Sequence, residues 1–336
     1  MISFCKAPAM TLNRIGPATI FFVLMALVPL SGSEFWTMIA TEVLIMGLFA
    51  MSFNLIYGYM GQISFGHAAF FGAGAYATAM IQHRLGLDYG WVFFALLASI
   101  PVAAIAAALI GFFVIRRTGI YFAILTMAFG ELMFFLVFSS YGLTGGDNGI
   151  QGLLPPPLLR APSHYHYFVL VIVALCCLLI WRITQSPFGY TLRAIRDNAR
   201  RVRFIGVDVE RCMWVNFVVS GAFAGLAGGL WAPFTRSVAP TLLNWQESGI
   251  PVFMALIGGA YTFAGPLFGS LIYTLLHAWV AGITQYWSLV IGLVMVFIVF
   301  LAPSGVVGVI LAHLRPRAKA APAGRKTQAV ATAGRS

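Results

Sequence analysis

The sequence predicts an all-α polytopic membrane protein, with about ten transmembrane or re-entrant helices and both termini in the cytoplasm. Hydrophobic residues make up 60% of the 336 residues and charged residues only 9%, whereas an ordinary soluble domain has about 25% charged residues. Several apolar runs, such as 91–115 and 287–311, approach or exceed the roughly 20 residues needed to cross a hydrocarbon core. This composition excludes a soluble enzyme.

The candidate spans follow the alternation of apolar runs and polar breaks. They lie at 17–33, 35–58, 61–83, 91–115, 120–140, 164–182, 212–235, 248–261, 266–283 and 287–311. The span at 61–83 is rich in glycine and that at 248–261 is short, so either of them could be re-entrant. We predict one membrane domain over 1–311, which includes a polar cytoplasmic segment at 184–210, and a basic disordered tail at 312–336.

The basic residues fall on one side of these spans. Seventeen of the 20 Lys and Arg residues face the cytoplasm when both termini lie there, and only Arg84, Arg160 and Arg236 face outside. This bias follows the positive-inside rule, and it explains the net charge of +11 without nucleic-acid binding. The N-terminal run also fits a signal peptide, whose removal would leave the other spans unchanged.

Several chemistries lack the residues that they need. A phosphate-binding loop ends in Gly-Lys-Ser/Thr, but the one lysine that precedes a threonine, Lys326, follows Arg325. The chain therefore cannot hydrolyse ATP by that route, and we predict no cofactor of its own. We also predict no metal site, because His164 and His166 diverge on a helix and have no carboxylate or thiol nearby.

Polar residues inside the spans are candidates for a translocation path. Glu131 is the most informative, because an acidic side chain at mid-membrane costs about 2.5–3.5 kcal/mol even on the most permissive scale. The other candidates are Glu42, Asn54, Gln62, His67, Asn216 and His277. Such residues either line a path or a helix break, or form hydrogen bonds that hold helices together. A proton-relay carrier would use the same residues, so they leave the energy source open.

Small residues at four-residue spacing predict close helix packing. They are Gly221, Gly225 and Gly229 on one span, Ala103, Ala107 and Gly111 on another, and Gly265 and Gly269 on a third. In lipid, such faces let helix backbones approach and gain dispersion contacts. The pattern indicates a multi-helix bundle and says little about a substrate.

Four stretches resemble one family, the Liv-type permeases of branched-chain amino acid importers of the ATP-binding-cassette class. They are NLIYGYMGQISFGHAAFFGAGAY at 54–76, the Gly130-Glu131 helix with TGGDNGI at 144–150, GYTLRAIRDN at 189–198 with Gly206 and Asp208 beyond it, and IGGAYTFAGPLFG at 257–269. The resemblance covers roughly 35–312, and the long Thr-Gly-Gly loop favours the longer of the two sister permeases. Tyr261 departs from the family's usual glycine, and Ala199-Arg200-Arg201 replaces a more acidic stretch.

The resemblance implies an importer in the bacterial inner membrane that moves leucine, isoleucine, valine or related small amino acids. Its partners would be a sister permease, two cytoplasmic ATPases that use the ATP, and an external solute-binding protein. Close cousins carry urea, short amides or aromatic acids. An ion-coupled secondary carrier remains an alternative of another class, whereas a membrane-embedded enzyme is disfavoured because no nucleophile–base pair or metal cluster is present.

Two groups of site residues follow from these arguments. Candidates for the substrate path or the outer mouth are Glu131, Gln62, His67, Asn54, Thr144, Gly145, Gly146, Asn148 and Gly149. Candidates for coupling to the ATPase are Gly189, Leu192, Arg193, Ile195, Arg196, Asp197, Asn198, Arg200 and Gly206.

The coupling candidates lie on a predicted cytoplasmic helix over 187–205. Ser186 can cap it, Pro187 suits its first turn and Gly206 can end it. Leu192 and Ile195 belong to an apolar stripe, beside a stripe of arginines. We predict that the apolar stripe enters a groove on the ATPase; the competing interpretation is a helix that rests on anionic membrane lipid.

Overall fold

The computed structural model describes residues 12–85, 91–301 and 305. Its helices are α1 (Leu12–Leu27), α2 (Glu34–Asn54), α3 (His67–Leu85), α4 (Trp91–Val114), α5 (Ile120–Ser139), α6 (Tyr141–Thr144), α7 (Pro162–Gln185), α8 (Pro187–Phe204), α9 (Val209–Thr235), α10 (Trp245–Gly258), α11 (Gly265–Ala281) and α12 (Trp287–Leu301). Shorter elements are η1 (Val28–Ser31), the π-helix η2 (Leu55–Tyr59), η3 (Gly146–Asn148), η4 (Pro157–Leu159), η5 (Pro240–Leu243) and the paired strands β1 (Ile150–Gln151) and β2 (Ser237–Val238). The predicted tail at 312–336 lies outside the described residues.

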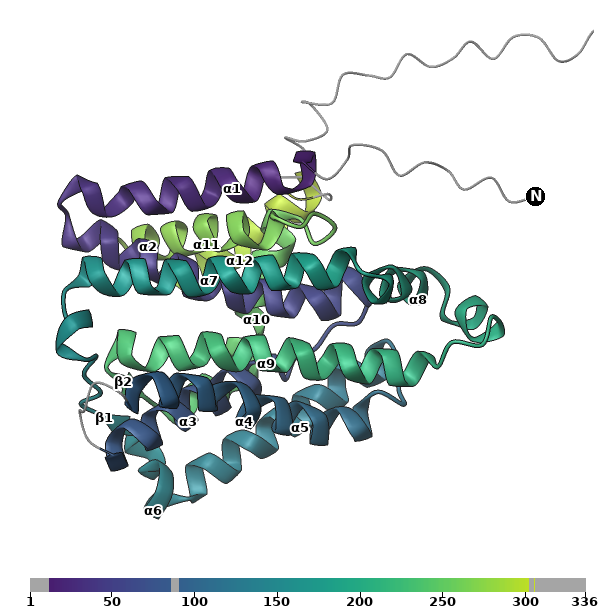
Figure 1. Ribbon diagram of the computed structural model, residues 1–336, viewed down its shortest axis with the longest axis horizontal. Coiled ribbons are helices and arrows are strands. Elements are labelled where there is room, and N and C mark those ends of the chain that lie inside the picture. Colours follow the sequence, from purple (N-terminus) through teal and green to yellow (C-terminus); the bar gives the residue numbers. More distant parts are fainter. Residues whose placement is uncertain (1–11, 86–90, 302–304, 306–336) are drawn as a thin grey trace, which may run out of the picture.

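The long helices lie side by side, and most of them run along one common direction (Figure 1). Among the described residues, five helical segments are long and apolar enough to cross a membrane: Glu34–Tyr59, Phe93–Val114, Ile120–Ser139, Pro162–Gln185 and Val209–Thr235. The predicted all-α polytopic membrane protein is therefore confirmed. The number of ten spans stays a prediction, because several of the remaining helices are shorter.

The centre of the bundle is α2 with its continuation η2. It contacts α7, α9, α10 and α11, and Phe49, Phe53 and Leu44 on it are almost completely buried. A helix that is apolar on all sides is suited to such a central position, because it presents no polar face to water. Helices α3 and α4 pack on α9, and α5 packs on α3 and α4. The outward faces of α4, α5 and α7 carry exposed apolar side chains.

The predicted close-packing faces meet one another. A Cβ atom built on Gly221 would overlap Ala107, and one on Gly225 would overlap Ala103, so α9 lies against α4 along the expected residues. On α11, a Cβ atom on Gly269 would overlap the backbone of α10. Side chains of ordinary size would push these helices apart and remove dispersion contacts over the whole interface.

Helix α8 has the predicted ends but is not continuous. Ser186 Oγ accepts a hydrogen bond from the Gly189 amide at 3.4 Å, and Gly206 follows the helix with φ +88°. However, Asn198 has φ −162° and ψ 92°, which breaks the predicted single helix into two pieces. The Asn198 side chain then accepts from the Arg201 amide at 3.0 Å and caps the second piece.

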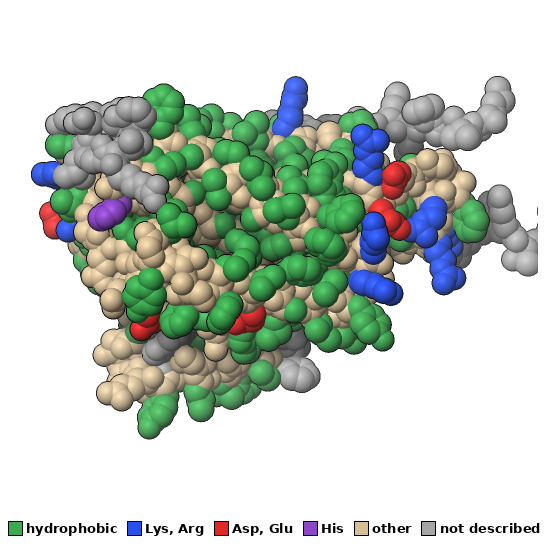
Figure 2. All heavy atoms as spheres, turned by 90° about the horizontal axis from the view of Figure 1, so that it is seen from below, with side chains coloured by type: hydrophobic (Ala, Val, Ile, Leu, Met, Phe, Trp, Pro, Cys, Tyr) green, Lys and Arg blue, Asp and Glu red, His purple; other side chains and the backbone are tan. Residues whose placement is uncertain are grey.

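The two ends of the bundle differ in charge. Figure 2 shows Lys and Arg side chains gathered at the end that carries α8, while apolar side chains cover much of the middle of the same face. The opposite end carries the β1–β2 pair and the loop that contains α6 (Figure 1). This distribution is the one expected when the α8 end faces the cytoplasm.

Labelling of single cysteines tests this orientation. In a variant without Cys5, Cys176, Cys177 and Cys212, we expect a cysteine at Ser163 to react with a membrane-impermeant maleimide in intact cells. A cysteine at Arg200 should react only after the membrane is permeabilised. Labelling of the Arg200 position in intact cells would contradict the predicted topology.

Candidate functional site

Two helices of the bundle are interrupted within its depth. The first interruption follows η2, where residues 60–66 leave the helix before α3 begins at His67. The helix of the span predicted at 61–83 therefore begins six residues later than expected, at His67. Gly61 lies in the segment with φ +76°, a backbone conformation that residues with a Cβ atom rarely adopt. Such a residue ends the helical path and turns the chain.

The second interruption precedes α10. The chain re-enters the bundle through η5, whose Leu243 packs against Gly72 of α3, and α10 begins at Trp245. The helix has 14 residues, or about 21 Å at 1.5 Å per residue, which is shorter than a hydrocarbon core of about 30 Å. The span that sequence placed at 248–261 thus begins inside the bundle.

The two interruptions meet, and side chains from neighbouring helices satisfy their backbone. Ser248 Oγ of α10 accepts from the amide of Ala68 in the first turn of α3 at 2.9 Å. Thr126 Oγ1 of α5 accepts from the Phe65 amide at 3.2 Å. These bonds matter because a backbone group without a partner in hydrocarbon costs several kcal/mol.

Glu131 supplies the third of these bonds. Its Oε1 accepts from the amide of Trp245, the first residue of α10, at 3.0 Å. A carboxylate at this place receives a charge-assisted bond and also interacts favourably with the positive end of the α10 dipole. The structure therefore places Glu131 at a helix break by a hydrogen bond that also joins α5 to α10, so the contact fits both of the roles that its position predicted.

Glu131 lies on a face that the described chain leaves open. It is half-buried, and its neighbours Leu132 and Phe135 are 49% and 62% exposed. Only 17% of the apolar window of α5 is buried. An ionisable side chain facing lipid is costly, so a face that carries one is suited to a protein partner or a water-filled path.

The other polar candidates in the spans have different surroundings. His67 is buried beside Phe49 and Phe53 and pairs with Ser52 Oγ at 3.0 Å. Asn54 is buried at the end of α2. Both therefore lie in the packed interior around α2.

Gln62 and Asn216 connect the region around η2 to neighbouring helices at the α8 end. Gln62 Oε1 accepts from the Gly119 amide at 2.8 Å, and Asn216 Nδ2 donates to the Leu55 carbonyl of η2 at 2.8 Å. The Asn216 bond occupies a carbonyl in the π-helix, where the regular α-helical pattern of bonds is lost.

The Thr-Gly-Gly loop lies at the end opposite α8 (Figure 1). Thr144 Oγ1 donates to the carbonyls of Val137 and Ser140, at 2.6 and 2.8 Å, and accepts from the Gly146 amide. Gly145, Gly146 and Gly149 have φ between 57° and 78°, and Asn148 is exposed between them. The loop is thus a rigid turn, and the structure keeps it apart from Gln62 and Asn54.

Two arginines attach α8 to the bundle instead of facing outward. Arg193 Nη2 donates to the Thr184 carbonyl at 2.5 Å, and its guanidinium lies over the rings of Tyr190 at 4.5 Å and Tyr59 at 5.6 Å. Such cation–π contacts contribute about 0.5–2 kcal/mol each, depending on exposure.

Arg196 connects α8 to η2 and to the turn that follows α10. Its Nη1 donates to the Gly58 carbonyl in η2 at 2.5 Å, and its guanidinium lies 5.1 Å from the centre of the Tyr261 ring. Tyr261 belongs to the turn between α10 and α11, and it is the residue that departs from the family's glycine. Asp197 forms an exposed ion pair with Arg196 at 3.4 Å.

The apolar stripe of α8 packs against its own chain. Leu192, Ile195 and Val202 are at most 5% exposed. This burial counts against the predicted entry of the stripe into a groove on the ATPase, which stays a prediction. The exposed apolar side chains lie at the tip of α8, where Phe204 is 91% and Ile205 is 78% exposed.

The remaining coupling candidates are spread around α8. Gly189 packs against the Thr184 backbone, Arg200 and Asp197 are exposed, Asn198 forms the break, and Gly206 ends the segment. The structure thus brings Arg193 and Arg196 to the bundle and leaves Arg200 free of it.

The sequence did not indicate that Thr126 and Ser248 accept hydrogen bonds from the backbone of other segments, or that the Tyr261 ring contacts Arg196. A hydroxyl in an apolar span usually bonds to its own helix, so nothing in the local pattern distinguishes one that serves another segment. The described residues contain no cluster of His, Cys, Asp or Glu suited to a metal ion.

Comparison with known proteins decides the family. A family model described as "Branched-chain amino acid transport system / permease component" matches residues 35–299. The chain belongs to this family. No solved structure matches the chain.

The permease resembles both types of protein in such systems. It is 27% identical to the high-affinity branched-chain amino acid transport system permease protein LivM of Escherichia coli over 312 residues, which are 84% of this chain and 71% of that protein. The LivM protein of Salmonella typhimurium is 28% identical over the same shares. The corresponding LivH protein of Escherichia coli is 24% identical over 287 residues, or 78% of the permease and 90% of LivH.

Replacing Glu131 tests its role at the start of α10. We expect Glu131→Ala to lower leucine uptake at least tenfold while the assembled complex remains, because α10 loses its cap and the open face loses its carboxylate. Loss of a cap costs about 0.5–2 kcal/mol, so a small decrease in thermal stability should accompany it. Uptake in proteoliposomes and size-exclusion chromatography measure the two effects.

Glu131→Gln is the matched control, since the amide oxygen can still accept the bond from Trp245. Recovery of uptake in this variant would assign the effect to the cap, and continued loss would assign it to the charge. Normal uptake in Glu131→Ala would refute a role in the path, whereas loss of the complex would indicate a purely structural role.

Proposed function

We propose that this permease is a subunit of an ATP-driven importer of leucine, isoleucine, valine or a related small amino acid in the bacterial inner membrane. The observation that carries the proposal is the meeting of two interrupted helices beside a half-exposed glutamate. In many transporters, substrates bind near the membrane midplane where interrupted helices end. Membership of a branched-chain amino acid permease family supports the class of substrate.

The chemistry at this place suits a zwitterion. The first turns of α3 and α10 have the positive ends of their helix dipoles inside the bundle, which favours the carboxylate of an amino acid. The second oxygen of Glu131 can accept from its ammonium group. Within the described residues, the buried Ser64 Oγ has no hydrogen-bond partner, so one further donor and acceptor is available in the interrupted segment.

The open face of α5 is the proposed contact with a sister permease. The path would then run between two subunits and keep Glu131 away from lipid. Relatives of both the LivM and LivH types support a pair of different permeases. A solute-binding protein would dock at the end that carries the rigid Thr144 loop, and would deliver the amino acid there.

Two cytoplasmic ATPases would bind at the α8 end and supply the energy. The exposed tip of α8 offers an apolar pair, Phe204 and Ile205, beside the exposed Arg200 and Arg201. The first piece of α8, behind the break at Asn198, is anchored through Arg196 to η2 and to the turn that follows α10, so a movement of α8 would reach both. In this arrangement, the tip replaces the buried stripe as the contact with the ATPase.

Reconstitution distinguishes this function from its alternatives. Proteoliposomes with both permeases, both ATPases and the binding protein should take up leucine only with ATP, and ionophores should not stop uptake. Uptake that needs an ion gradient and no ATP would support the carrier. Competition by urea, short amides or aromatic acids, without competition by leucine, would support an importer of those compounds.

Substitution of the α8 tip tests coupling. We expect the double variant Phe204→Ser, Ile205→Ser to assemble its membrane domain normally but to lose substrate-stimulated ATP hydrolysis and uptake together, at least tenfold. The conservative pair Phe204→Leu, Ile205→Leu keeps an apolar tip and should retain most of both activities. Unchanged hydrolysis in the serine variant would favour the interpretation in which α8 rests on lipid.

A further inference from the structure

A pocket opens at the α8 end, between α8 and the bundle. Its volume is about 120 Å³. The apolar part of its wall comes from Met60, Ile115, Ile195, Ala199, Val209 and Met213. The rest of the lining comes from Gly61, Gln62, Thr118, Arg116, Arg196, Arg203 and Glu210, so the pocket is as polar as it is apolar.

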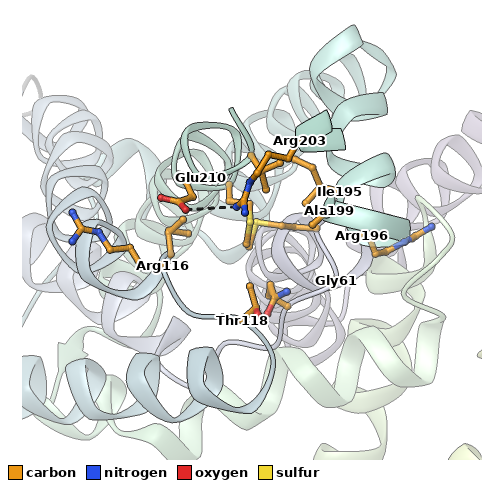
Figure 3. Close-up of a pocket in the computed structure, with 13 residues that line it drawn as sticks. Gly61, Arg116, Thr118, Ile195, Arg196, Ala199, Arg203 and Glu210 are labelled. Carbon is orange, nitrogen blue, oxygen red and sulfur yellow. Dashed lines mark ion pairs between the residues drawn. The ribbon is translucent and has the colours of Figure 1, made fainter. Parts of the chain in front are cut away.

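Two opposite charges meet at the edge of the pocket. Arg203 of α8 and Glu210 of α9 reach toward each other, with Arg203 Nη2 and Glu210 Oε1 3.6 Å apart (Figure 3). Both side chains are more than half exposed, at 66% and 59%. Ion pairs this exposed are weak, so either group is available to a ligand.

The other two arginines around the pocket do not turn their charge into it. In Figure 3, the guanidinium groups of Arg116 and Arg196 point away from the pocket, so only their stems contribute to its wall. Arg116 lies over the ring of Phe112, and Arg196 over that of Tyr261. The pocket therefore presents one positive and one negative group, which is unsuited to a phosphate or another simple anion.

We propose that this pocket binds a zwitterionic amino acid with an aliphatic side chain. The carboxylate of the ligand would pair with Arg203 and its ammonium group with Glu210, while the side chain would enter the apolar part. A cavity of about 150 Å³ holds benzene, so the volume of about 120 Å³ is sufficient for the four carbons of a leucine side chain. The ligand would replace a weak ion pair with two charge-assisted contacts.

The position of the pocket indicates that a bound amino acid regulates transport. This inference rests on the proposed import of such amino acids. The pocket lies between α8 and α9, and beside Met60, Gly61 and Gln62 of the interrupted segment. A bound amino acid would tie α8 to α9 and to this segment and would hinder the movement of α8. Accumulated product on the α8 side would thereby slow its own import.

Direct binding tests the pocket without transport. The purified full-length chain in lipid nanodiscs is dialysed against tritiated leucine. We expect affinity for leucine to fall at least tenfold in Glu210→Gln and in Val209→Phe, which fills the pocket. Arg211→Gln is the matched control, because it removes a neighbouring charge that does not line the pocket. Equal binding by all four proteins would place the ligand elsewhere and overturn the proposal.

A set of leucine analogues tests the chemistry of recognition. Alanine lacks the long side chain, 4-methylpentanoate lacks the ammonium group, and isoamylamine lacks the carboxylate. Each should compete at least tenfold more weakly than leucine. Competition by 4-methylpentanoate as strong as that by leucine would contradict the role of Glu210, and equal competition by isoamylamine would contradict that of Arg203.

The regulatory effect is tested in the assembled transporter. Proteoliposomes carry the ATPases outside, and the binding protein and leucine inside, so that external leucine reaches the α8 side. External leucine should lower ATP hydrolysis at least fivefold in the wild type and in Arg211→Gln, but less than twofold in Glu210→Gln and Val209→Phe. Inhibition that is absent, or equal in all four, would overturn the regulatory role. Failure of internal leucine to stimulate hydrolysis at all would instead refute the proposed importer.

Discussion

The architecture depends on one constraint, which is that backbone amides and carbonyls inside a membrane must find partners within the protein. A continuous helix meets this constraint by itself, but the two segments that enter α3 and α10 do not. Thr126, Glu131 and Ser248 supply the missing acceptors from α5 and α10. These bonds make the two interruptions interdependent, since Ser248 of one serves the amide of Ala68 in the other. A change that releases one of them exposes backbone groups in both.

The chain from η2 to the first turn of α3 links the basic end of the bundle to its middle. Phe65 and Ala68 in this stretch bond to Thr126 and Ser248, and Gly58 bonds to Arg196 of α8. The Arg196 side chain bonds to the Gly58 carbonyl and lies on the Tyr261 ring, so α8 is attached both to η2, which leads into the first interruption, and to the turn that follows α10. The unusual Tyr261 therefore has a structural role, because a glycine there would offer no ring to the guanidinium. Contacts therefore run from Arg196 of α8 to η2, and from the segment that follows η2 to Thr126 on the helix that carries Glu131.

This arrangement also gives the two ends of the molecule different properties. At the end opposite α8, the Thr144 hydroxyl and three glycines with positive φ hold a compact turn. At the α8 end, the break at Asn198, the exposed Phe204 and the adjacent pocket leave a less closely packed structure. A compact turn suits docking of a soluble partner, whereas a helix with a break suits transmission of movement.

The amino-acid sequence by itself determined the class of the protein, because composition, apolar run length and charge bias act on every residue and need no tertiary information. It also determined the ends of α8 through Ser186 and Gly206, and the close-packing face that contains Gly221 and Gly225, since caps and small-residue faces are local patterns; the tertiary structure decided that this face packs on α4. Only the tertiary structure decided where α3 and α10 begin, because the acceptors that permit those breaks come from residues far away in the chain. The same holds for the apolar stripe of α8. Periodicity identified Leu192 and Ile195 as residues to be buried, but only the positions of the surrounding helices decided that the burial is against this chain and not a partner.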